Sequence, residues 1–314
     1  MVIINALQSV LTVVIVIFLG YILTARKWFD DSTGRLFSKL VVNISLPAMM
    51  ISNIMTSFKR EDLQNAGRGI VIPFISMLIV YIAAAVLSRL FNINKGRRGL
   101  FETMFFVSNT IFIGMPVNIA LFGEQSVPYV LLYYIANTTL FWTYGIGKIK
   151  NDAGHEPDKL FTTSTLKKIM SPPLMGFAAG VVLVLLNVQL PKFIMDSCKY
   201  IGNLTTPLSL LFIGITFHSI DLKEIRPSMD MGLLLLGRFV ISPLTVYALS
   251  LLIPIPVLMT KVFIIQSAMP VIVNAAVTSR AFGADYKFAT IMVTVTTIAS
   301  LLFIPIYMLL LSGL

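Results

Sequence analysis

Two Met-Pro pairs, each set among amide and hydroxyl side chains, have the residue types and spacing of a binding site. The members of the two clusters are Ser108, Asn109, Thr110, Met115, Pro116 and Asn118, and Gln266, Ser267, Met269, Pro270 and Asn274. Proline inside a helix removes a backbone hydrogen bond and clashes with the preceding turn. A broken helix offers N–H groups that suit an anion and C=O groups that suit a cation. The clusters therefore predict a ligand site where two interrupted helices meet.

The same side chains also join packed helices in a membrane. We interpret Asn109 and Gln266 as substrate contacts. For the other polar members of the two clusters, substrate contact and helix packing both stay open.

The elements that position these clusters must lie in a lipid bilayer. The 314-residue chain is 57% hydrophobic and 12% charged, with a mean hydropathy of +0.88, whereas soluble domains carry about 25% charged residues. A net charge of +10 fits basic cytoplasmic loops better than nucleic-acid binding. One cysteine excludes an internal disulfide and a cysteine-based metal site.

Ten apolar stretches are long enough to span a bilayer as helices. They cover residues 2–24, 36–57, 69–91, 100–122, 128–147, 169–189, 200–219, 229–252, 261–281 and 288–312. Of the 24 basic residues, 16 fall in one alternating set of connections and 6 in the other. The richer set should face the cytoplasm. We therefore expect a multi-pass plasma-membrane protein with both termini outside.

The two halves of the chain resemble each other. Asn43 and Pro47 are spaced like Asn203 and Pro207, Pro73 corresponds to Pro243, and the Met-Pro pairs correspond as well. Because each half has five spans, an odd number, the second half enters the membrane from the opposite side. The sequence predicts a 5+5 inverted repeat, with halves at 1–147 and 169–314 joined by a cytoplasmic loop at 148–168.

Four segments carry a resemblance to the auxin efflux carrier family, which includes plant PIN-type carriers and bacterial organic-acid permeases. They are VVNISLPAMMISNI (41–54), SNTIFIGMPV (108–117), GRFVISP (237–243) and IIQSAMP (264–270). The resemblance implies an all-α membrane fold in which broken helices four and nine cross at their prolines. It also implies elevator-type movement, a homodimer and a fold related to those of bile-acid symporters and sodium–proton antiporters.

Three polar residues outside the clusters are further candidates. Asn43 and Asn203 lie four residues before a proline, so each amide either satisfies loosened backbone on the same helix face or contacts substrate. Arg238 lies about 15 Å into its span at 1.5 Å per residue, and a charge at that depth marks a functional site by default. Arg238 could attract an anion or gate its passage, bind helix carbonyls, or extend toward water.

The crossover contains no carboxylate, and Glu102 lies near the cytoplasmic end of its span. This argues against a sodium–proton exchanger and against a cationic cargo. The expected partners are the lipid bilayer and a small organic anion, either malate-like or an indole carboxylate. Trp28 and Trp142 do not obviously line the crossover. Sodium coupling, proton coupling, exchange and facilitation stay open, and we expect no other cofactor.

Rival classes have less support in the sequence. An intramembrane enzyme would need a paired nucleophile and base or a metal motif such as HExxH, and the chain has neither. An anion channel and a non-transporting membrane receptor remain alternatives, because mirrored broken helices can also line a pore.

Overall fold

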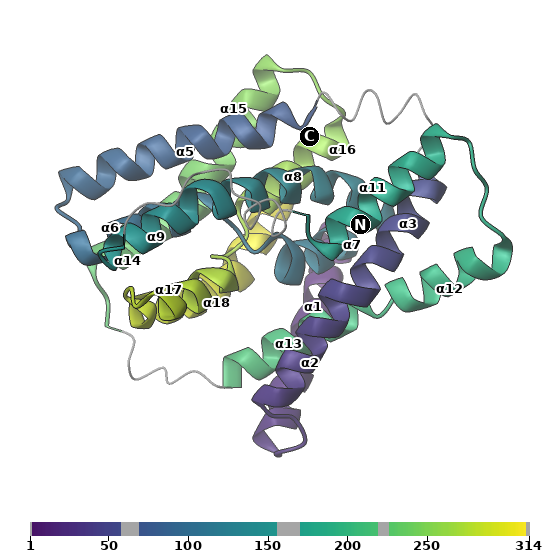
Figure 1. Cartoon of the computed structure of the whole chain (residues 1–314), viewed down its shortest axis with the longest axis horizontal. Helices are drawn as coiled ribbons and strands as arrows, with labels where there is room; N and C mark the ends of the chain where they lie inside the picture. The colour runs from purple at the N-terminus through teal and green to yellow at the C-terminus, as the bar shows by residue number, and fades with distance from the viewer. Residues whose placement is uncertain (1, 58–68, 156–169, 219–225, 312–314) are drawn as a thin grey trace.

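The computed structural model describes residues 2–57, 69–155, 170–218 and 226–311, and within these ranges most of the chain is helical (Figure 1). The one extended pairing among them is an isolated antiparallel bridge between Ser108 and Val271. The fold is thus an all-helical one built from apolar segments. Residues 156–168 of the expected cytoplasmic loop lie outside the described residues.

Helices cover all five spans expected in the first half of the chain. They are α1 (Val2–Ala25), α2 (Asp31–Leu40), α3 (Leu46–Ser57), α5 (Val71–Leu90), α6 (Arg98–Phe106), α7 (Met115–Phe122), α8 (Val127–Leu140) and α9 (Ile146–Asp152). Short 3-10 helices lie at Lys95–Arg97 and Glu124–Ser126. The fifth span is longer than expected, because α8 continues through a π-helical turn at Phe141–Gly145 into α9.

The second half has the same density of helix. Its helices are α11 (Pro172–Leu185), α12 (Lys192–Gly202), α13 (Thr205–His218), α14 (Met229–Leu236), α15 (Ser242–Leu252), α16 (Val257–Ser267), α17 (Val273–Phe282) and α18 (Tyr286–Leu311). Among the described residues, five continuous helices are long and apolar enough to cross a membrane. Length and composition therefore make this a multi-pass membrane protein.

Three π-helical turns stand at a fixed distance before a proline. The turns Val41–Ser45, Thr110–Gly114 and Gly237–Ile241 end two residues before Pro47, Pro116 and Pro243 respectively. A proline removes one N–H and crowds the carbonyl four residues earlier. A wider turn accommodates that defect while the helix continues. The helices therefore continue through these three prolines without interruption.

The helices pack as two groups. The peripheral group consists of α1, α2, α3, α11, α12 and α13, and the crossover group consists of α5 to α9 and α14 to α18 (Figure 1). Inside the peripheral group, glycines allow close approach: a Cβ on Gly20 would lie 2.6 Å from Leu211 O, and one on Gly176 would lie 2.7 Å from Pro47 O. Small residues at such crossings are the usual means of packing membrane helices.

Candidate functional site

The fourth span is interrupted at Val107–Asn109, seven to nine residues before the position expected from Pro116. Helix α6 ends at Phe106, and helix resumes at Thr110 in the π-helical turn that leads into α7. Pro116 is the second residue of α7, which continues from the π-helical turn, and this wider turn accommodates the missing N–H. The expectation that the helix breaks and crosses at Met115-Pro116 is therefore wrong; both residues are buried inside continuous helix.

The ninth span is interrupted around Pro270. Helix α16 ends at Ser267 and α17 begins at Val273, which leaves residues 268–272 outside helix. The two interruptions meet there: Ser108 forms the antiparallel bridge with Val271, and the Asn109 N–H donates to Pro270 O at 2.8 Å. The crossing point of the two broken spans is thus Ser108–Asn109 against Pro270–Val271.

Side chains of α8 and α18 form hydrogen bonds with the backbone at this crossing. Asn137 of α8 accepts from the Ser108 N–H at 2.8 Å and donates to Ser108 O at 3.0 Å. Thr296 of α18 accepts from the Val271 N–H at 3.1 Å. Buried backbone groups must be paired, and here one polar side chain from each half does it. The sequence analysis missed both residues, although an asparagine in the apolar run of α8 was an available signal.

Arg238 lies fully buried beneath the crossing. Its guanidinium donates to carbonyl oxygens only: Phe105 O at 3.1 Å, Ser267 O at 2.6 Å and Met269 O at 2.9 and 3.2 Å. Phe105 and Ser267 belong to the last turns of α6 and α16. Of the alternatives for Arg238, the structure favours the binding of helix carbonyls, and Arg238 lines none of the described cavities.

In this arrangement the C-terminal and the N-terminal ends of the broken helices have different electrostatic surroundings. The negative C-terminal ends of α6 and α16 are capped by one cation. The positive N-terminal ends, at Thr110 and at Val273, face a cavity instead. The first-turn amides of a helix have no partner within the helix, and such ends favour anions. Some of these amides have local acceptors: the Phe112 N–H donates to Asn109 Oδ1 at 3.2 Å, the Thr110 N–H to Ser108 O at 3.0 Å and the Ala275 N–H to Ile272 O at 3.1 Å.

That main cavity has a volume of about 250 Å³ and lies between the two helix groups. Its lining is uncharged and partly aromatic, and consists of Ser38, Val42, Leu46, Asn109, Thr110, Ile111, Phe112, Tyr134, Thr138, Phe141, Trp142, Ser171, Pro173, Ile272, Val273 and Asn274. The expectation that Trp142 lies away from the crossover is wrong. The cavity can hold a small ligand with an apolar body.

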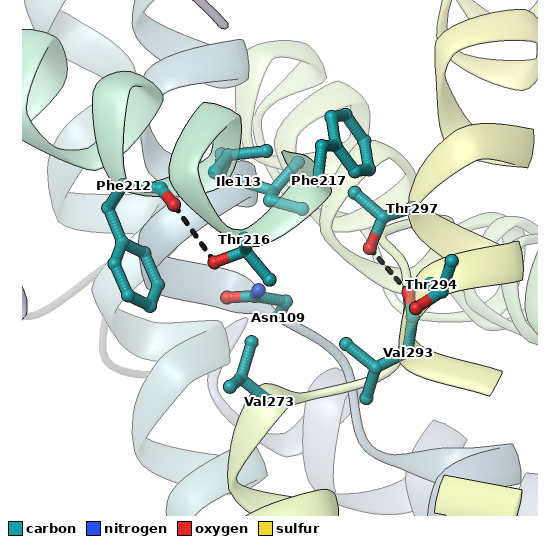
Figure 2. Close-up of a pocket in the computed structure, with 10 residues that line it drawn as sticks. Asn109, Ile113, Phe212, Thr216, Phe217, Val273, Val293, Thr294 and Thr297 are labelled. Atoms are coloured by element: carbon teal, nitrogen blue, oxygen red, sulfur yellow. Dashed lines mark hydrogen bonds between the residues drawn. The ribbon is translucent and has the colours of Figure 1, made fainter. Parts of the chain in front are cut away.

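A second cavity of about 20 Å³ shares part of its lining with the main cavity. Figure 2 shows Asn109 at its centre, with Phe212 and Thr216 of α13 on one side and Thr294 and Thr297 of α18 on the other. Asn109 and Val273 line both cavities. The crossover residue Asn109 therefore lies in the wall that the two cavities share.

Of the remaining residues predicted to contact substrate, one lines the main cavity and others are buried away from it. Asn274 lines the main cavity, whereas the Gln266 amide is buried and donates to Thr110 O at 3.3 Å. Asn118 is buried and donates to Gly114 O at 2.7 Å. Gln266 and Asn118 thus contact the π-helical turn rather than the cavity, and each leaves a buried side-chain oxygen without a hydrogen bond.

Four other predicted residues make backbone contacts or lie at the surface. Ser108 is buried in the crossing, and Ser267 donates to Ile264 O at 2.7 Å while its own carbonyl accepts from Arg238. Asn43 is exposed and donates to Lys39 O at 2.8 Å, and Asn203 is exposed. Asn43 therefore has the backbone role that its spacing from Pro47 allowed.

Residues 5–308 match the family described as membrane transport protein. An uncharacterized transporter of Methanocaldococcus jannaschii is 26% identical over 96% of this chain and 97% of its own length. An uncharacterized transporter of Methanothermobacter thermautotrophicus is 24% identical over 98% of this chain and 99% of its own.

Proposed function

Because the chain belongs to the membrane transport protein family, the family of auxin efflux carriers, we propose that it is a carrier for a small organic anion that binds in the main cavity. The observation that carries this proposal is the sorting of helix ends at the crossover. Arg238 occupies the carbonyl ends, and the N–H ends of both broken spans face the cavity. A carboxylate fits such a site without any charged side chain in contact with it.

The lining favours one carboxylate on an apolar body. None of the lining residues carries a formal charge, so a second carboxylate would lose its hydration without gaining a counter-ion. Phe112, Phe141 and Trp142 offer ring surface, and Tyr134 hydrogen-bonds Ser171 at 2.9 Å across the cavity wall. An indole-type monocarboxylate matches this lining better than malate does.

Alternating access is supported by the position of the cavities. All three described cavities lie where the peripheral group meets the crossover group. A sliding of the crossover group along α1, α3 and α13 would expose Asn109 to one membrane face and then to the other. Paired prolines and broken spans fit the 5+5 inverted repeat, with both termini outside, on which such movement depends.

Binding and transport of named acids test the proposal. Purified protein in lipid vesicles should bind indole-3-acetate more tightly than malate, and should take up the labelled acid with saturation. Asn109→Ala should weaken binding with little change in thermal stability. Uptake of neither acid above that of protein-free vesicles, or uptake of a cation instead, would overturn the proposal. Currents far larger than carrier turnover would assign the chain to channels.

A further inference from the structure

Two side chains with a formal charge are fully buried in the described part of the chain, and the transport site accounts for only one of them. Arg238 is held by the crossover carbonyls. The other is Glu102 of α6, which is 1% exposed. Burial of a carboxylate is costly unless a partner compensates it. The groups around Glu102 must therefore offset its charge.

Glu102 belongs to a compact cluster at the start of α6. Ser88 of α5 donates to one carboxylate oxygen at 2.9 Å, and Lys148 Nζ of α9 lies 3.1 Å from the other. Asp152, also on α9, accepts from the Gly99 and Leu100 N–H groups at 2.9 and 2.7 Å. Glu102, Lys148 and Asp152 together form what we call the charge triad.

The charge triad holds more negative than positive charge. Two carboxylates face one ammonium group, so the ionised triad carries one unit of excess negative charge. One added proton makes the triad neutral.

Other charges around α6 do not supply the missing cation. From α5, Tyr81 places its ring 5.4 Å from Lys148 Nζ. The remaining charged groups on α6 and on the elements packed against it lie at the surface or have partners of their own. Lys95 is exposed, Arg89 donates to Ala85 O, and Arg98 donates to Ile93 O. Arg97 pairs with Asp230 and Asp285, Lys150 lies over the Phe282 ring, and Arg280 lies over the Tyr286 ring.

The triad is connected both to water and to the crossover. The side chain of Lys148 is 33% exposed while that of Glu102 is 2% exposed, so the ammonium group lies between the carboxylate and solvent. Helix α6 ends one turn after Glu102, at the crossing. The helix that carries Lys148 and Asp152 continues from α8, whose Asn137 holds Ser108. A change in the triad therefore acts on both elements that position Ser108.

We propose that Glu102, Asp152 and Lys148 form a proton-binding site whose proton accompanies the anion. This proposal rests on the proposed function. One proton binds to a carboxylate oxygen of the triad before the crossover group slides across the membrane and leaves that oxygen after the group has moved; no other bond forms or breaks. With a monocarboxylate as substrate, the loaded carrier then moves no net charge.

Infrared difference spectroscopy of the protein in lipid tests proton binding without any substrate. The wild type should show a protonated-carboxyl band that grows as the pH is lowered. Glu102→Gln and Asp152→Asn should each lose this titrating band, because either change leaves one carboxylate matched by one lysine. Lys148→Met should keep the band at pH values where the wild type has lost it. Asp196→Asn, a change in an exposed ion pair of α12, is the control.

Two outcomes of the spectroscopy overturn the proton site. One is a titrating band that survives in both carboxylate variants, and the other is a Lys148→Met band that follows the wild type. A purely structural triad would destabilise the variants without this pattern, so thermal unfolding of each variant is measured alongside. The result does not depend on which anion is carried and therefore stands even if the proposed function fails.

Uptake driven by a pH gradient tests coupling through the initial rate of labelled indole-3-acetate entry, from which the rate in protein-free vesicles is subtracted because the neutral acid crosses lipid unaided. One coupled proton adds about 1.36 kcal/mol of driving force per pH unit, so the protein-dependent rate should show a gain as the gradient is raised. Glu102→Gln should carry the acid without this gain, and Asp196→Asn should retain it. A gain in Glu102→Gln equal to the wild-type gain would overturn coupling through the triad.

Discussion

Asn137 and Ser108 are joined by two hydrogen bonds, in which the Asn137 amide pairs with both backbone groups of Ser108 at 2.8 and 3.0 Å. Asn137 is fully buried in α8, and Ser108 is the residue of the fourth span that bridges to Val271. One side chain thus substitutes for the helical hydrogen bonds that the interruption removes. The geometry of Asn109, the next residue, depends on this pair.

Asn137→Ala should leave the Ser108 N–H and C=O buried and unpaired. Each unpaired buried group costs about 1–3 kcal/mol, so thermal unfolding should shift to lower temperature. Anion binding should fall as well, because Asn109 is no longer fixed. Wild-type stability and binding in Asn137→Ala would contradict this account of the crossing.

Arg238→Lys separates positive charge from hydrogen-bonding geometry. Lysine keeps the charge but cannot reproduce the planar fork of donors that reaches Phe105, Ser267 and Met269. We expect lower thermal stability and weaker binding of indole-3-acetate in the lysine variant, and a larger loss of both in Arg238→Met. Full binding in the lysine variant would mean that charge alone suffices and that the capping of carbonyls is secondary.

The helices were predictable because the length and apolarity of each run reflect the thickness of the bilayer. The polar clusters at the crossing were visible for a similar reason, since polar residues in such runs are rare. The exact point of interruption was not predictable from Pro116. A π-helical turn at Thr110–Gly114 accommodates that proline, and nothing in the local sequence distinguishes this turn from a break.

Long-range partners were also out of reach of the sequence. The acceptors of Arg238 are backbone carbonyls separated from it by 133, 29 and 31 positions, and any residue type has such a carbonyl. Trp142 shares a helix face with Tyr134 and Thr138, but the sequence does not show that this face meets the cavity. The partners of Arg238 and the position of Trp142 both depend on which distant parts of the chain lie side by side in the fold.

Pro116→Ala and Pro270→Ala should differ in their effect on transport. Pro116 lies in continuous helix, so its replacement restores an N–H where helix already exists and should leave uptake at the wild-type rate. Pro270 lies in the buried interruption, where alanine adds chain freedom and an N–H that needs a partner. We expect slower uptake in Pro270→Ala. Equal loss in both variants would contradict the position of the break.

Gly114→Ala should disturb the contact between the fourth and ninth spans. A Cβ at Gly114 would lie 2.8 Å from Gln266 Cδ and Nε2, and overpacking of a buried contact costs about 1–3 kcal/mol. Gly147→Ala is the matched control, because a Cβ there meets nothing within 4 Å and alanine favours helix over glycine by about 0.5–1 kcal/mol. Thermal unfolding should therefore move down for Gly114→Ala and stay or move up for Gly147→Ala. A melting temperature of Gly114→Ala equal to or above that of the wild type would show that the Gln266 side chain moves aside without cost.

Trp142→Ala tests whether the main cavity recognises a ring. Trp142 lines this cavity and packs edge-on against Phe141, with ring centroids 5.1 Å apart. Aromatic contacts contribute about 0.5–1.5 kcal/mol beyond burial, so the affinity for indole-3-acetate should fall about tenfold. The affinity for a short aliphatic monocarboxylate should change little, since it does not reach the ring. Trp28→Ala, at a position 75% exposed, should leave both affinities unchanged. An equal loss for the aromatic and the aliphatic acid would show that Trp142 shapes the cavity rather than contacting the ligand ring.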